Sequence, residues 1–196
     1  MKTRYLNAII MFMLVSSTGG LLFVFNRNYA FLALCSIVIL SFLYIGKPLK
    51  KVPFISSVLT FLIVSLLFII NYIFAINPQS LTKYSFFGII ILTTVLVLFY
   101  FNNNDDKRAL INSLYFILKL ILYHSLISFI AYFLIKENLS LISSEYHESL
   151  TYNYLFYYSP NDLSIINLFG LEFIRNSGMF WEPGILQAYL NILFFL

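Results

Sequence analysis

Five apolar runs, separated by short polar connections, constrain this chain more than any other feature of its sequence. A helix that crosses a hydrocarbon core of about 30 Å needs roughly 20 predominantly apolar residues. We expect spanning helices near residues 5–25, 29–46, 54–76, 84–101 and 110–135. The sequence therefore predicts a multi-pass membrane protein built from helices.

The composition excludes a soluble domain. Hydrophobic residues make up 61% of the 196 residues and charged residues only 10%, whereas a soluble domain carries about 25% charged residues. The net charge is +4, but the basic residues lie mainly between the apolar runs, so they indicate membrane topology and no nucleic-acid partner. The single cysteine, Cys35, has no partner within the chain, which excludes an internal disulfide.

The basic residues also predict the orientation, because cytoplasmic connections are rich in Lys and Arg. Basic residues precede the first run and occupy the connections after the second and fourth runs: Lys2, Arg4, Lys47, Lys50, Lys51, Lys107 and Arg108. We therefore expect a cytoplasmic N-terminus. The segment 137–182 is then a long extracytoplasmic loop.

The expected fold is an all-α, polytopic helix bundle. Its five complete spans occupy 1–136, the loop occupies 137–182, and 183–196 begins a sixth span. The helix over 183–196 would be only about 20 Å long, too short to cross, so we expect a truncated piece of a longer protein. Within the first run, Ser16 and Gly20 form a small-xxx-small pair that allows close helix packing.

The loop combines aromatic and acidic residues, including Tyr157 and Tyr158. Aromatic faces beside carboxylates suit a sugar, whose C–H face packs on the ring while its hydroxyls bond to the acids. The alternative is an aromatic belt at the membrane surface. The segment Glu145-Tyr146-His147-Glu148 lacks the HExxH spacing of a metal site, and no metal or other cofactor is expected. Leu163 to Phe173 is expected to be a short amphipathic helix on the membrane.

The segment Arg175-Asn176-Ser177-Gly178-Met179-Phe180-Trp181-Glu182-Pro183-Gly184 closes the loop and opens the last apolar run. Arg175 presents a planar, charged fork that suits phosphate or diphosphate. Pro183 favours a helix start, whose N–H groups and positive dipole end also favour an anion. Gly178 lets the backbone approach a ligand closely. The alternatives are that Arg175 binds lipid headgroups and that Glu182 caps the helix.

Two ionisable residues interrupt the fifth run. Lys119 is expected to extend its amine toward the cytoplasmic surface; the alternative is a buried lysine on a substrate path. His124 is expected to hydrogen-bond with tyrosines of neighbouring helices.

From Arg175 to Phe195 the sequence RNSGMFWEPGILQAYLNILFF resembles the segment of bacterial O-antigen and capsular polysaccharide polymerases, and of the related O-antigen ligases, where a large periplasmic loop enters the next span. The likeness covers about twenty residues, and the rest of the chain is similar in topology alone. The resemblance implies an inner-membrane enzyme that transfers oligosaccharide units from undecaprenyl diphosphate, without a metal.

By this resemblance, Arg175 contacts the lipid-linked diphosphate and Glu182 acts near the acceptor sugar. Gly178, Trp181, Tyr157 and Tyr158 complete the expected substrate site. Membrane lipids and a chain-length regulator are the other expected partners. Three alternatives stay open: a transporter or lipid-carrier flippase, whose polar groups should line the spans; an O-antigen ligase; and a non-catalytic membrane subunit.

Overall fold

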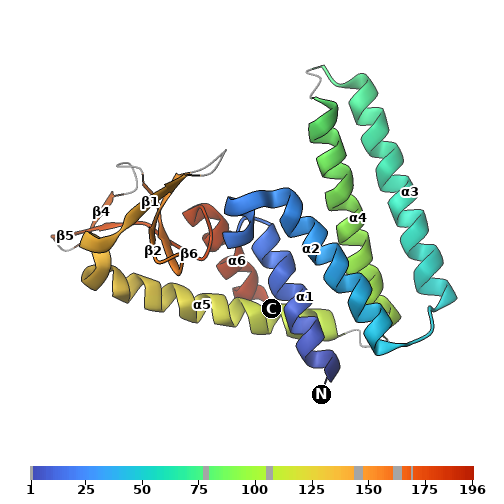
Figure 1. Cartoon of the computed structure of the whole chain (residues 1–196), viewed down its shortest axis with the longest axis horizontal. Coiled ribbons are helices and arrows are strands. Elements are labelled where there is room, and N and C mark those ends of the chain that lie inside the picture. The colour runs from blue at the N-terminus through green and yellow to red at the C-terminus, as the bar shows by residue number, and fades with distance from the viewer. Residues whose placement is uncertain (1, 77–79, 105–107, 144–147, 161–164, 169) are drawn as a thin grey trace. The chain divides into compact units, whose positions relative to one another are not determined.

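A computed structural model describes residues 2–76, 80–104, 108–143, 148–160, 165–168 and 170–196 (Figure 1). The described part of the chain is mostly helical, at 73%. The helices are α1 Lys2–Ser17, α2 Leu21–Ile45, α3 Lys51–Phe74, α4 Leu81–Asn103, α5 Ala109–Ile135, a short 3-10 helix Lys136–Asn138, and α6 Pro183–Phe195. The strands are β1 Ser140–Ser143, β2 Glu148–Tyr152, β3 Phe156–Tyr158, β4 Ile165–Leu168, β5 Leu171–Ile174 and β6 Asn176–Gly178.

Four helical segments in the described part of the chain are long and apolar enough to cross a membrane. They are Asn28–Ile45, Lys51–Phe74, Leu81–Asn103 and Ala109–Asn138. They agree with the second to fifth predicted spans and fit a membrane-embedded protein. The last apolar helix, α6, has 13 residues and begins at Pro183, the residue predicted to start it.

The first predicted span, 5–25, is not a continuous helix. α1 ends at Ser17, and the chain turns through Gly19, whose φ of +126° is open to glycine but rarely to other residues. A second interruption follows at Asn26, with φ −166° and ψ 104° inside α2. The hydropathy of this run favours one helix, but Gly19-Gly20 disfavours helical backbone at that point and interrupts it.

The prediction of an all-α fold is wrong for the segment between α5 and α6. β1, β2, β3 and β6 form an antiparallel four-stranded sheet in the order β1-β2-β3-β6, and β4 pairs with β5. Among the described residues of 163–173, β4 and β5 occur in place of the expected amphipathic helix, and Gly170, with φ +80°, immediately precedes β5; residues 163, 164 and 169 lie outside the described part. The alternation of burial along β2, where Ser149 and Thr151 are buried, is the two-residue period of a half-buried strand.

The chain divides into two compact units. The first contains Met1–Ile10 and Asn28–Leu110, and the second contains Met11–Arg27 and Ile111–Leu196. In the first unit Tyr100 is fully buried, packs edge-on against Phe42 and donates a 2.9 Å hydrogen bond to Asn7 Oδ1. The buried Asn103 accepts a 2.8 Å bond from the N–H of Lys50, the residue that precedes α3.

These contacts bring basic residues of the first unit to one end of it. On α1, Asn7 lies three residues after Arg4, and it bonds to Tyr100 of α4. On α4, Asn103 lies three residues after Tyr100, and it bonds to the N–H of Lys50 before α3. Lys47 Nζ donates a 3.4 Å bond to the carbonyl of Asn104 at the same end. The connection from α2 to α3 and the start of α1 therefore share one end of this unit.

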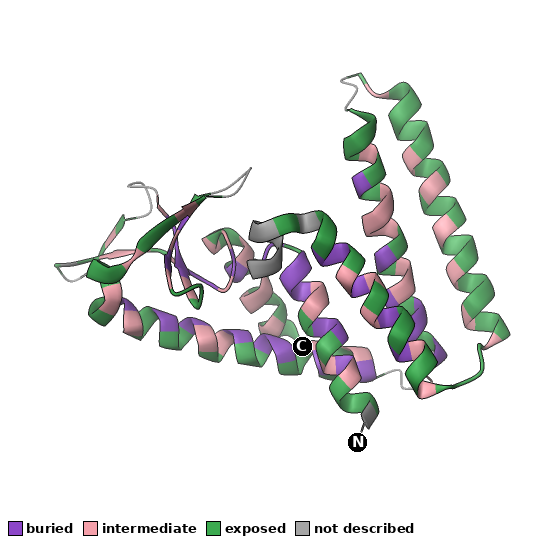
Figure 2. Ribbon diagram, viewed as in Figure 1, coloured by how far each residue is buried: buried purple, intermediate pink, exposed green. Residues whose placement is uncertain are grey.

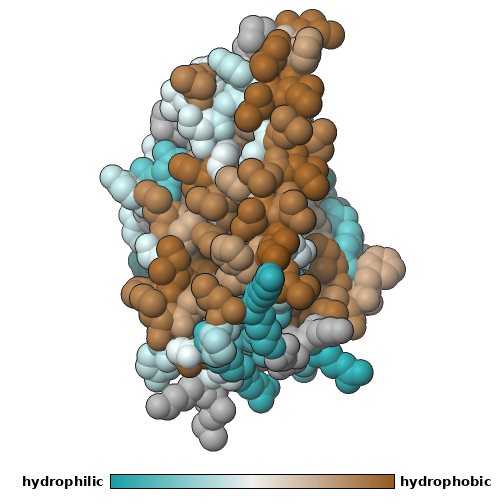
Figure 3. All heavy atoms as spheres, turned by 90° about the vertical axis from the view of Figure 1, so that its right-hand side faces the viewer, coloured by the Kyte–Doolittle hydropathy of each residue, from teal (hydrophilic) through white to brown (hydrophobic). Residues whose placement is uncertain are grey.

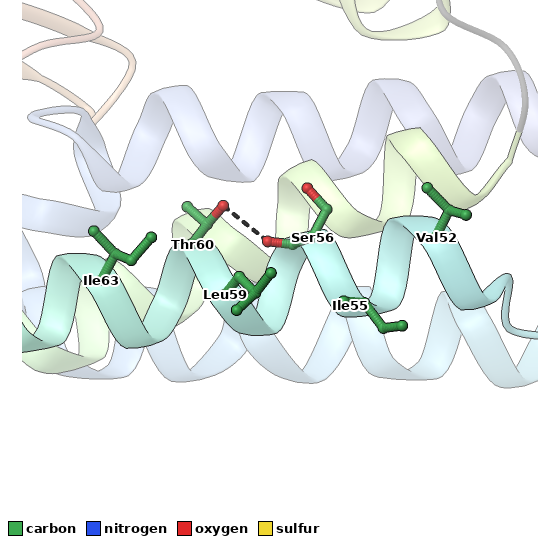
Figure 4. A pocket seen from close by; sticks show the side chains of 6 residues that line it. All are labelled: Val52, Ile55, Ser56, Leu59, Thr60 and Ile63. Atoms are coloured by element: carbon green, nitrogen blue, oxygen red, sulfur yellow. Dashed lines mark hydrogen bonds between the residues drawn. The ribbon is translucent and has the colours of Figure 1, made fainter.

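α3 has no buried residue, so almost its whole surface is exposed (Figure 2). Figure 3 shows this apolar surface, with hydrophilic side chains gathered below it. A shallow hollow of about 360 Å³ lies along one stripe of α3, and Figure 4 shows the six side chains that line it: Val52, Ile55, Ser56, Leu59, Thr60 and Ile63. Thr60 Oγ1 donates a 2.9 Å bond to the Ser56 carbonyl, which satisfies its hydroxyl within the helix.

Candidate functional site

The break after α1 and the segment before α6 lie against each other in the second unit (Figure 1). Gly20 pairs with Phe180 in an isolated antiparallel bridge, and the backbone N–H of Trp181 donates a 3.2 Å hydrogen bond to the Gly19 carbonyl. We call this contact the glycine junction; it consists of Gly19, Gly20, Phe180 and Trp181. It joins two segments that are far apart in the sequence, one directly after α1 and the other directly before α6.

Neither glycine of the junction leaves room for a side chain. A Cβ on Gly20 would lie 2.8 Å from both Cα and O of Ser16, and one on Gly19 would lie 2.6 Å from Ile185 Cδ1 and 3.0 Å from Trp181 Nε1. The Ser16/Gly20 pair was expected to pack one helix closely on another, but here the close contact of Gly20 is with the backbone of Ser16 itself. The approach occurs at a helix break and not along a continuous helix.

Phe180 is the buried centre of the junction. Its side chain is 0% exposed and stacks on Tyr189 of α6, with ring centroids 5.1 Å apart and planes at 12°. The Tyr189 hydroxyl shares a hydrogen bond with Thr18 Oγ1. The start of α6 is thus held to the end of α1 through both backbone and side chains.

Asn176 ties the same segment to α5. Its Nδ2 donates to the Ser125 carbonyl at 2.7 Å and to Ser125 Oγ at 3.2 Å, while its Oδ1 accepts from Ser128 Oγ at 3.0 Å and from the Gly178 N–H at 2.7 Å. One amide therefore satisfies groups on α5 and in β6 together. The sequence pattern did not single out this residue, because an asparagine in a loop has no distinctive spacing.

The two tyrosines predicted to bind substrate are buried. Tyr157 and Tyr158 are each 1% exposed. The Tyr157 hydroxyl donates to the Tyr154 carbonyl at 3.2 Å, and the Tyr158 hydroxyl donates to the Ser128 carbonyl at 2.7 Å. Their rings are not accessible to a sugar in this structure; the Tyr158 contact holds the sheet on α5, and the Tyr157 bond is made to the turn before β3.

Burial raises the pKa of Tyr157 to about 12 from its ordinary value of 10.0, with a smaller contribution from Tyr154 and an opposing one from the hydrogen bond with Thr151. The unfolded chain would lose this proton near pH 10.0 while the folded chain keeps it. This group therefore leaves the stability unaffected below that pH, and the stability should fall by about 2 kcal/mol as the pH rises to about 12.

A spectrophotometric titration of tyrosinate, compared between the natural chain and a Tyr157→Phe variant, measures this effect. The difference curve should have its midpoint near pH 12. A difference curve centred at the ordinary tyrosine pKa would show that Tyr157 is accessible to water.

Unlike the two tyrosines, the charged residues Arg175 and Glu182 are exposed. Arg175 is exposed and immediately precedes β6, where its carbonyl accepts a 3.3 Å bond from the Ser159 N–H. Glu182 is exposed at the N-cap position of α6, but its side chain makes no capping bond. The capping alternative for Glu182 therefore has no support in this geometry, and both charged groups face outward from a fixed backbone.

The two other residues expected to bind substrate lie between these charges. Gly178 is buried and has φ +62°, and a Cβ there would contact Leu186 and Ser125 at 3.5 and 3.7 Å. Trp181 is half-buried at the glycine junction. Gly178 allows the turn and the packing on α6, so its expected contact with a ligand is not needed to explain a glycine there.

His124 bonds to the loop and not to a tyrosine of another helix. Its Nε2 lies 2.9 Å from the Leu155 carbonyl, and its ring lies 5.3 Å from that of Phe156. Among the described residues no partner reaches its buried Nδ1, and the same holds for the buried hydroxyls of Ser16 and Ser177. Lys119 Nζ lies 6.0 Å from the ring centroid of Tyr123 on the same helix.

Part of the predicted loop chemistry falls outside the described residues, namely Glu145, Tyr146, His147 and Asp162. Glu148 begins β2 and is exposed. In the part of the chain that the structure describes, no group of three or more His, Cys, Asp or Glu side chains could hold a metal ion.

Comparisons with protein-family models, with curated proteins and with solved structures find no match for this chain. The class that the fold supports is a mostly helical protein with four described helices long and apolar enough to cross a membrane and, in its second unit, an antiparallel four-stranded sheet. Its candidate site is the segment from Arg175 to Glu182, held by Asn176 and the glycine junction.

Proposed function

We propose that this chain belongs to an enzyme that polymerises lipid-linked oligosaccharide repeat units into O-antigen or capsular polysaccharide. The reaction is glycosyl transfer from undecaprenyl diphosphate at the periplasmic face of the bacterial inner membrane. The proposal comes from the likeness of the segment that begins at Arg175 to that family. It draws support from how this segment is folded.

The observation that carries the proposal is the contrast within this segment. Arg175 and Glu182 are exposed, whereas Ser177, Gly178 and Phe180 between them are buried. The buried residues and the hydrogen bonds of Asn176 fix the backbone between Arg175 and Glu182. The backbone positions of the two charged residues are therefore set before a substrate binds. Preorganised charges lower the cost of stabilising a developing charge in a transition state.

The chemistry that suits these groups is direct displacement at a sugar carbon. A hydroxyl oxygen of the acceptor sugar forms a bond to the anomeric carbon of the donor, and the bond from that carbon to the diphosphate oxygen breaks. Undecaprenyl diphosphate leaves with the electron pair. Glu182 takes the hydroxyl proton, and the Arg175 guanidinium binds the departing diphosphate through two-point contact.

The charge of the first unit supports the proposed orientation. Arg4, Lys47 and Lys50 belong to segments at one end of it, which under the positive-inside rule is the cytoplasmic end. The N-terminus is then cytoplasmic. α3, α4 and α5 cross in turn, so the segment after α5 begins on the periplasmic side.

Replacing Arg175 by Ala, or Glu182 by Gln, in the gene that encodes this chain should reduce polymerisation by about 100-fold, as the loss of one transition-state contact does in other enzymes. The surface polysaccharide should shift from long chains to single repeat units. Gel electrophoresis of the polysaccharide measures the length distribution, and an immunoblot checks that the protein is present.

Lys136→Ala and Glu172→Gln are matched controls, because both residues are exposed charges of the same region. They should leave the length distribution unchanged. An unaltered distribution in both the Arg175 and the Glu182 variants would contradict the proposal. Failure to join the polysaccharide to its lipid anchor, with chain length preserved, would instead favour the ligase alternative.

A further inference from the structure

The turn between β2 and β3, Tyr152–Phe156, lies beside the middle of α5. The carbonyl of Leu155 is 2.9 Å from His124 Nε2. The apolar segment Ala109–Asn138 has 30 residues, of which roughly 20 cross the hydrocarbon core. Any stretch of that length within the segment begins by residue 119 and ends no earlier than residue 128, so it includes His124.

The turn therefore reaches below the membrane surface wherever α5 is placed along the bilayer normal. At its shallowest, His124 lies four residues inside the end of the crossing stretch, which is about 6 Å along the helix. The contacts of β3, the strand after the turn, place the chain nearer to the C-terminal end of α5 as it leaves the turn. The Tyr158 hydroxyl bonds to the carbonyl of Ser128, one turn nearer to the C-terminal end of α5.

Polar backbone groups in the hydrocarbon layer must be satisfied within the protein, and four carbonyls of this turn have a partner in the chain. The carbonyl of Tyr152 accepts from the Leu155 N–H at 3.0 Å, and that of Tyr154 accepts from the Tyr157 hydroxyl at 3.2 Å. The carbonyl of Phe156 accepts from Thr151 Oγ1 at 3.0 Å. With the bond from His124 to Leu155, the carbonyls of Tyr152, Tyr154, Leu155 and Phe156 are all accounted for within the protein.

The tyrosine, leucine and phenylalanine side chains of the turn also suit the boundary of a bilayer; Asn153, which is exposed as well, is polar. No charged residue occurs between Glu148 and Asp162, and this stretch contains five tyrosines and phenylalanines. Tyr154 and Leu155 are 53% and 60% exposed at the tip. Tyrosine is favoured where hydrocarbon meets headgroups, because its ring is apolar and its hydroxyl is polar.

We infer that the Tyr152–Phe156 turn inserts into the bilayer and that its exposed side chains contact lipid. The partner is the hydrocarbon layer at the level of the acyl-chain carbons nearest the headgroups. The segment after α5 is then re-entrant and not a loop lying wholly outside the membrane. The inference rests on the contacts of the turn with α5 and is independent of the proposed glycosyl transfer.

Nitroxide labels on single cysteines test this in the full chain reconstituted into phosphatidylcholine and phosphatidylglycerol vesicles. Cys35→Ala removes the native thiol, and Leu155→Cys places the label at the tip. Ser143→Cys is the matched control, because Ser143 is exposed and pairs with Glu148 at the other end of the sheet. Paramagnetic relaxation by oxygen, which concentrates in hydrocarbon, is compared with relaxation by a water-soluble nickel chelate.

The label at position 155 should collide with oxygen several-fold more often than with the chelate, and the label at position 143 should show the reverse. Equal chelate access at both positions would overturn the inference, because the tip would then face water or a water-filled cavity. Exclusion of both agents from position 155 would also overturn it, because protein would then cover the tip. Unchanged Trp181 emission in both labelled variants checks that the fold is retained.

Discussion

Replacing Gly20 by alanine is expected to disrupt the glycine junction and to lower the stability of the second unit by about 3 kcal/mol, the upper range for an overpacked site. The added Cβ would lie 2.8 Å from the Ser16 backbone, which cannot rotate away as a side chain can. Either the helix end or the Phe180 segment must move.

Two measurements follow this change. The midpoint of thermal unfolding in detergent should fall, and the emission of Trp181, the only tryptophan of the chain, should shift to longer wavelength as water reaches the junction. Gly184→Ala is the matched control, since a Cβ there meets no atom within 4 Å. Alanine favours a helix over glycine by up to about 1 kcal/mol, so this control should be neutral or slightly stabilising. Native-like emission and midpoint in the Gly20 variant would contradict the junction.

Replacing Asn176 by alanine is expected to be the second most damaging change. It removes four hydrogen bonds and leaves the Gly178 N–H and the Ser128 hydroxyl without this acceptor. Each buried group left unsatisfied costs about 1–3 kcal/mol, so the free energy of unfolding should fall by about 3 kcal/mol. The same variant should lose polymerisation if Arg175 needs a fixed backbone beside it.

The midpoint of unfolding and the rate of proteolysis between β1 and β6 measure this loss. Asn138→Ala is the control, because Asn138 is exposed at the end of the short helix after α5. A surface change of that kind should stay within about 0.5 kcal/mol of the natural chain. An Asn176 variant as stable as this control would mean that water replaces the amide without cost.

Long apolar runs determined the helices of this protein, and the sequence was sufficient to find them. α3, α4 and α5 agree with their predicted runs to within three residues at either end, because a helix in lipid must satisfy its own backbone over the full thickness of the hydrocarbon core. The start of α6 at Pro183 was also predictable, since proline lacks the N–H that a first helical residue does not use.

The strands between α5 and α6 were harder to find. Their short runs of Ile, Leu, Tyr and Phe are compatible with a helix or a strand, and three to five residues are too few to distinguish the two periods. The expected helix over 163–173 failed for this reason. In the candidate site, Arg175 and Glu182 were found from their charge, whereas Asn176 and Gly19 were not, because their importance depends on what packs against them.

By itself, then, the sequence determined that the chain is a membrane protein of apolar helices, and it drew attention to the segment from Arg175 to Gly184. Only the tertiary structure decided that this segment meets Gly19 and Gly20, that Tyr157 and Tyr158 are buried, and that the segment after α5 contacts α5 at His124. The physical reason is that the free energy of placing an apolar run in lipid depends on the residues of that run alone. Contacts between distant segments depend on the shapes of both partners, which no single stretch of sequence contains.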